Sequence, residues 1–145
     1  MTDYLELLYL ILFTGILAVG YSYLLSGQIL SSSPGNARMQ EIASAIQIGA
    51  KAYLNRQYKT IAIVGIIVLA IVTYFFSYLV GIGYFIGAFL SGVAGYVGML
   101  ISVKANVRTA EAARHSLQSG LTIAFKSGAI TGLLVAGLAL LAITF

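Results

Sequence analysis

The stretch Tyr84–Val103 reads YFIGAFLSGVAGYVGMLISV and contains no Lys, Arg, Asp or Glu. Its length matches the roughly 17 to 25 apolar residues that a helix needs to cross a bilayer. Three further stretches of this kind flank it, so four transmembrane helices are expected, at residues 5–25, 60–80, 84–103 and 121–143. Only Glu6 and Lys126 are charged within them, and each lies near an end of its stretch.

The composition supports the same fold class. Hydrophobic residues make up 60% of the chain and charged residues 8%, against about 25% charged in a typical soluble domain. A secretory signal is not expected at the N-terminus, because Asp3 and Glu6 precede an apolar run that is too long. Residues 1–145 are therefore predicted to form one membrane domain, an all-α polytopic bundle of transmembrane helices.

The positive charges indicate an orientation. None of the eight Lys and Arg residues lies before the first span or between the second and third. They occupy the connections at residues 26–59 and 104–120, with Lys126 just beyond the second connection. The positive-inside rule therefore places both connections in the cytoplasm and both chain ends outside. This topology accounts for the net charge of +4, and no nucleic-acid partner is expected.

Neither connection has the pattern of a loose loop. After the breakers at residues 31–35, apolar positions recur with helical spacing from Met39 to Leu54. Two alternatives are open for this segment: a helix that lies on the lipid headgroups, or an extension of the second span that packs on protein. The third span is also expected to continue, to near Gly120, because no Gly or Pro lies between Lys104 and Ser116.

A charged stripe is predicted on the extension of the third span. Its members follow steps of four, three and four along the chain and so share one helical face. They are Lys104, Arg108, Glu111 and His115. The simplest interpretation is a surface face with Arg108–Glu111 and Glu111–His115 pairs. A role toward headgroups or substrate is the alternative.

A second face of the same helix contains only small or short polar residues, again three or four positions apart. Its members are Gly87, Ser91, Gly95, Gly98, Ser102, Asn106, Thr109 and Ala113. Small residues in line let membrane helices approach closely, so we predict a helix-packing stripe. Gly128 and Gly132 form a shorter pattern of this type on the fourth span.

The chemistry of an active site is missing from the sequence. No span has an ionisable residue at its centre, which argues against a self-contained four-helix cation transporter. There is no cysteine, phosphate-binding loop, histidine cluster or pair of carboxylates. We therefore assign no catalytic, cofactor-binding or metal-binding residue, and a non-enzymatic membrane scaffold subunit remains an alternative.

Two segments nevertheless form a specific pattern. Residues 87–114 contain the small-residue stripe, the pair Gly98-Met99 and the run ANVRTAEAAR at 105–114. Before the second span come RMQEI at 38–42 and GAKAYL at 49–54. Together with the glycine-spaced fourth span, Gly128–Gly137, these segments resemble the N-terminal part of membrane-integral pyrophosphatases, the pyrophosphate-energised proton or sodium pumps.

The resemblance implies partners and a role. Those pumps are homodimers of larger chains that hydrolyse magnesium-bound pyrophosphate, and their acidic motifs lie on later helices with no counterpart here. The resemblance therefore implies that the complete enzyme uses Mg²⁺ and pyrophosphate and that this chain binds neither of them. It also implies that the partners of this chain are the remaining helices of the pump and the lipid bilayer. These four helices would support the pump from an outer ring, so Gly95→Leu, and Ala110→Leu beside the stripe, should weaken assembly. These four helices do not indicate whether the pump transports protons or sodium ions, or whether it requires potassium.

Overall fold

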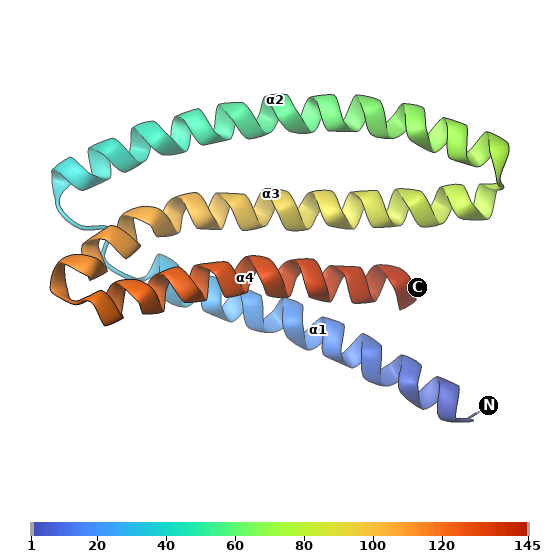
Figure 1. Ribbon diagram of the computed structural model, residues 1–145, viewed down its shortest axis with the longest axis horizontal. Helices are drawn as coiled ribbons and strands as arrows, with labels where there is room; N and C mark the ends of the chain where they lie inside the picture. The colour runs from blue at the N-terminus through green and yellow to red at the C-terminus, as the bar shows by residue number, and fades with distance from the viewer. Residues whose placement is uncertain (1, 145) are drawn as a thin grey trace.

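The computed structural model describes residues 2–144, and side chains from Tyr4 onward; Met1 and Phe145, the ends of the predicted domain, lie outside the described residues. In this range the chain forms α1 (Thr2–Leu30), α2 (Ala37–Phe75), α3 (Tyr78–His115) and α4 (Leu117–Thr144), and no strand. Neighbouring helices run in opposite directions (Figure 1). All four are long and apolar enough to cross a membrane, which confirms the predicted all-α fold.

The second helix is continuous from Ala37 to Phe75. At about 1.5 Å per residue it is roughly 58 Å long, about twice the thickness of a hydrocarbon core. The chain thus forms an extended second span rather than a separate interfacial helix. The helix begins after Gly35, whose φ of 79° favours glycine. The Asn36 side chain then accepts a 2.9 Å hydrogen bond from the Met39 N–H and caps the first turn.

Only part of the apolar face of this extension, between Met39 and Leu54, is buried. Ala43 and Leu54 are buried, but Ile42, Ile46 and Tyr53 are exposed. Gln47 is partly covered and lies on the side that faces α3. The apolar pattern therefore predicted the helix correctly and its packed face only in part.

Two predicted boundaries are wrong. The turn between the second and third spans falls at Phe76 and Ser77, so residues 78–80 begin α3. The third helix ends at His115, and Gly120 lies inside α4. In each case a serine makes the break: Ser77 Oγ accepts from the Val80 N–H, and Ser116 Oγ from the Ser119 N–H. Because a capping serine can start a helix where no Gly or Pro is present, these two helix ends were not marked in the sequence.

The helices form a row in the order α2, α3, α4, α1 (Figure 1). Within the described residues α2 packs against α3 and contacts neither α1 nor α4. A buried cluster of Leu25, Ile29, Ala105 and Ile130 joins α1, α3 and α4 near the end of α1. The position of this cluster fixes that end of the row, where the 31–36 connection leads into α2.

Candidate functional site

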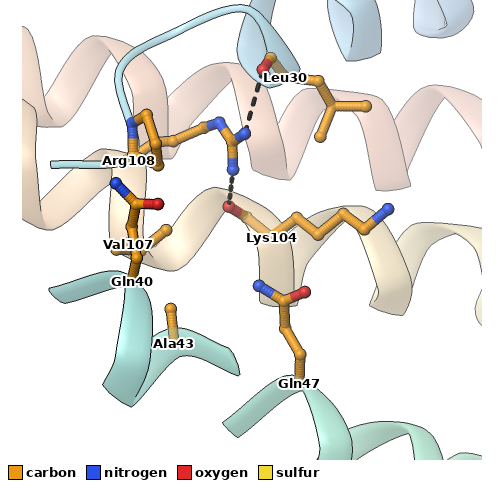
Figure 2. Close-up of a pocket in the computed structure, with 8 residues that line it drawn as sticks. Leu30, Gln40, Ala43, Gln47, Lys104, Val107 and Arg108 are labelled. Atoms are coloured by element: carbon orange, nitrogen blue, oxygen red, sulfur yellow. Dashed lines mark hydrogen bonds between the residues drawn. The ribbon is translucent and has the colours of Figure 1, made fainter. Parts of the chain in front are cut away.

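Arg108 of α3 holds the end of α1. Its guanidinium donates from Nη2 to the Leu30 carbonyl at 3.0 Å and from Nε to the Ser32 carbonyl at 3.2 Å. A third bond runs from Nη1 to the Lys104 carbonyl at 2.8 Å. Figure 2 shows the bonds to Leu30 and Lys104. The last carbonyls of a helix lack partners within it and have partial negative charge, so a guanidinium is well suited to them.

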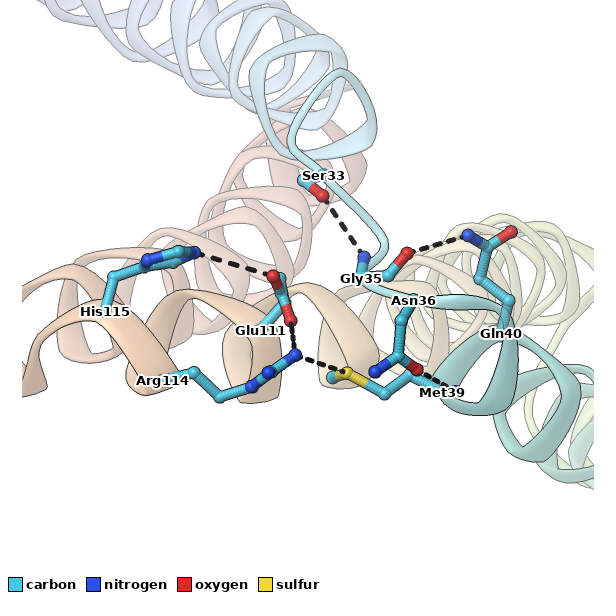
Figure 3. Close-up of polar contacts among 8 residues, drawn as sticks. All are labelled: Ser33, Gly35, Asn36, Met39, Gln40, Glu111, Arg114 and His115. Carbon is cyan, nitrogen blue, oxygen red and sulfur yellow. Dashed lines mark hydrogen bonds and ion pairs between the residues drawn. The ribbon is translucent and has the colours of Figure 1, made fainter.

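Glu111, one turn further along α3, is the centre of a polar cluster with the connection (Figure 3). Its Oε2 lies 3.0 Å from Arg114 Nη1 and its Oε1 3.5 Å from His115 Nε2. Arg114 also contacts the sulfur of Met39 at 3.8 Å. A Cβ atom on Gly35 would lie 3.0 Å from Glu111 Oε2, which means that the connection passes close to this carboxylate.

The structure tests the two side-chain pairs predicted for the charged stripe. The Glu111–His115 contact is confirmed. The predicted Arg108–Glu111 pair is wrong, because Arg108 is directed to the carbonyls of α1 and Glu111 pairs with Arg114 instead. Helical spacing shows which side chains share a face, but the carbonyl groups of another helix do not appear in that spacing.

A cavity of about 340 Å³ lies beside Arg108, between the end of α1, the start of α2 and the end of α3. Half of its lining is polar and half apolar. The lining residues are Leu30, Pro34, Gln40, Ala43, Gln47, Lys104, Val107 and Arg108. The charged stripe is thus divided: its first two members line this cavity, and its last two belong to the cluster of Figure 3.

The small-residue stripe faces more than one neighbour. Gly98 is buried, and a Cβ atom there would lie 3.0 Å from the Thr131 side chain of α4. Gly95 faces α2, since a Cβ there would lie 2.6 Å from Tyr58 Oη. Four members are partly covered: Gly87, Gly95, Ser102 and Thr109. Three are exposed: Ser91, Asn106 and Ala113. Its role as a packing face for other helices stays a prediction.

Sequence reasoning missed a close crossing between α1 and α4. A Cβ atom on Gly137 would lie 2.9 Å from the backbone oxygen of Gly15, so α1 and α4 touch through two glycines. By contrast, Gly128 and Gly132 have no neighbour within 4 Å in the same test. Gly15 lies near the middle of its span and Gly137 in the second half of its own, but nothing in the sequence pairs these two residues.

It also missed a polar contact between α2 and α3. The rings of Tyr58 and Tyr96 meet edge to face with centroids 5.2 Å apart. The Tyr96 hydroxyl donates to Asn55 Oδ1 at 3.1 Å. Lys126, the charged residue near the start of α4, also has a partner on another helix, because its Nζ donates to Gln28 Oε1 of α1 at 3.1 Å.

The residues present do not fit a magnesium site. Among the described residues no group of three or more His, Cys, Asp or Glu is placed to hold a metal ion. Of the carboxylates, Glu41 pairs with Arg38 at 2.7 Å, and Glu111 pairs with Arg114 and His115. We therefore derive no metal-dependent step from this chain.

Comparison with known proteins agrees with the helices and their pattern. Residues 16–145 match the family described as inorganic H⁺ pyrophosphatase. A K⁺-insensitive pyrophosphate-energized proton pump of Methanosarcina mazei is 45% identical over 129 residues, which cover 88% of this chain and 19% of the pump. A putative K⁺-stimulated pyrophosphate-energized sodium pump of Bacteroides thetaiotaomicron is 42% identical over 145 residues, which cover 96% of this chain and 20% of that protein.

These findings define an integral, multi-pass membrane protein. The chain belongs to the inorganic H⁺ pyrophosphatase family. It spans about a fifth of the length of the curated relatives it matches.

Proposed function

We propose that this chain works as the N-terminal, four-helix part of a pyrophosphate-driven ion pump, and that its own role there is structural. The observation that carries the proposal is the family match over residues 16–145. The long helices support it, because their exposed apolar residues provide surfaces for further helices. The described residues include no group of three or more His, Cys, Asp or Glu placed to hold a metal ion.

In the complete pump, Mg²⁺ and pyrophosphate would be held by residues outside these helices. Glu41 and Glu111 each lie against basic side chains, which satisfies their charge without a metal. The curated relatives include both a proton pump and a sodium pump. We infer that the transported ion is selected elsewhere in the pump, and that the complete chain forms a homodimer.

We further propose that both ends of the chain face away from the cytoplasm. The polar clusters around Arg108 and Glu111 lie at the end of the row that holds the connection at residues 31–36 and the break at Ser116. Arg38, Lys104 and Arg114 lie at the same end, whereas Arg56 and Lys59 lie near the middle of α2. The turn between α2 and α3 contains no basic residue and is flanked by exposed aromatic rings, including Tyr74, Phe75 and Tyr78. Aromatic residues favour the membrane interface, and basic loops favour the cytoplasm.

The test is Mg²⁺-dependent phosphate release from pyrophosphate by membranes that contain this chain alone, the remaining helices alone, or both. We expect release only when both are present. Release by this chain alone would contradict a structural role. If the remaining helices release phosphate equally well with and without this chain, the alternative function, a non-enzymatic membrane scaffold subunit, would be favoured.

A further inference from the structure

The cavity beside Arg108 has a positive lining. Lys104 and Arg108 are the charged residues of the lining, the Lys104 side chain extends away from Arg108 (Figure 2), and no carboxylate lines the space. In the part of the chain that the structure describes, the Lys104 ammonium makes no hydrogen bond or ion pair. Arg108 binds three carbonyls, and its guanidinium keeps further N–H donors beyond these. Cationic donors thus remain for a ligand.

The side of α2 that faces the cavity adds polar side chains with N–H groups that can donate to an anion. Gln47 points from α2 toward α3 (Figure 2), and the Gln40 amide donates one N–H to the Gly35 carbonyl at 2.8 Å and keeps a second N–H (Figure 3). Gln40 lies in the first turn of α2, a turn without an acidic residue. The N-terminal end of a helix has partial positive charge. Together these groups favour an anion with several acceptor oxygens, such as a phosphate group.

The position of Lys104 along α3 relates the cavity to the bilayer. From the first residue of the helix, Tyr78, to Lys104 the helix rises roughly 39 Å. A bilayer is about 30 Å thick in its hydrocarbon core and about 40 to 45 Å with its headgroups. If Tyr78 lies at one interface, Lys104 lies at the headgroups of the other. The lining also includes Leu30 and Val107, and Val107 lies about 5 Å further along α3 than Lys104, on the side away from the hydrocarbon core.

We propose that this cavity binds the phosphate of an anionic phospholipid headgroup. The lipid would lie between α2 and α3 and join the start of α2 to the end of α1. The depth of Lys104, at the level of the headgroups, favours this ligand over free phosphate. The proposal does not depend on the pump function, since it concerns only residues of this chain and the lipid around it.

The experiment is a lipid titration of the purified 145-residue chain in detergent, with bound lipid counted by native mass spectrometry. Phosphatidylglycerol is the anionic probe, phosphatidylcholine the zwitterionic comparison, and inorganic phosphate the soluble competitor. The variant is Lys104→Gln. Lys59→Gln is the matched control, because it removes one charge from α2 without touching the cavity. Lys104→Arg keeps the charge in place, and circular dichroism checks that each variant is helical.

We expect wild type to bind phosphatidylglycerol in preference to phosphatidylcholine. Lys104→Gln should weaken that binding about fivefold, the effect of one cation at a membrane surface, while Lys59→Gln and Lys104→Arg leave it unchanged. Equal losses from the two glutamine variants, or no loss from either, would overturn the proposal. Displacement of the lipid by millimolar phosphate would also overturn it and would assign the cavity to free phosphate.

Discussion

The guanidinium of Arg108 lies 3.0 Å from the carbonyl oxygen of Leu30, a residue far from it in sequence and at the end of another helix. One side chain of α3 thereby fixes the end of α1 and the start of the connection to α2. The family pattern at residues 105–114 includes this arginine, and the structure gives it a physical role in joining α3 to the end of α1 and to the connection that follows.

We predict that Arg108→Gln lowers the unfolding free energy of the chain by about 2 kcal/mol, because the carbonyls of Leu30 and Ser32 lose a charged donor. Denaturant unfolding followed by circular dichroism measures this. Arg56→Gln is the control, since Arg56 is exposed on α2. A loss of similar size in both variants would mean that net charge, and not the contact with α1, is responsible.

The glycine crossing gives a prediction with opposite signs. Gly137→Ala should destabilise the chain by about 1 to 3 kcal/mol, since its Cβ would press on the backbone of Gly15. Gly132→Ala should stabilise it by about 0.5 to 1 kcal/mol, because that position is open and alanine is the better helix former. The same unfolding measurement compares the two, and a gain of stability from Gly137→Ala would refute the crossing.

A third prediction separates packing within the chain from packing outside it. Gly95→Leu should displace Tyr58 and weaken the contact between α2 and α3, so the isolated chain loses stability. Ala110 is exposed, so Ala110→Leu should leave the isolated chain unchanged. If the exposed side of α3 packs on other helices of the pump, Ala110→Leu should lower assembly of the complete enzyme in a pull-down. Wild-type stability and turnover of the complete enzyme with Gly95→Leu would contradict a packing role.

The orientation is testable by labelling, because the chain has no cysteine of its own. Ser33→Cys lies in the connection between α1 and α2, and Ser77→Cys in the turn between α2 and α3. In intact cells a membrane-impermeant maleimide should label Ser77→Cys at once and Ser33→Cys only after permeabilisation. The reverse pattern would place both chain ends in the cytoplasm.

The sequence was sufficient for the four helices because a charge-free apolar stretch as long as a bilayer is thick is typical of a membrane span and of little else. The ends of the helices were less predictable. Ser77 and Ser116 each separate two helices by capping the second one. Serine also occurs inside these helices, for example at Ser22 and Ser127, so the residue type alone does not mark a helix end.

The sequence predicted which residues belong to the site better than it predicted which residues they contact. The spacing of Arg108 and Glu111 correctly placed both residues at one end of α3, but their partners come from α1, the connection and the next turn. The contact between Gly15 and Gly137 depends on how two distant helices cross, and local periodicity contains no information about that.

The row in which the helices are arranged has a consequence for transport. A water-filled channel needs protein on every side, and a single layer of helices has no interior to serve as one. In the described part of the chain α2 and α1 stand at opposite edges of this layer and do not meet. Any ion path that these helices border must therefore be enclosed by helices from elsewhere, and this chain would supply one side of its wall.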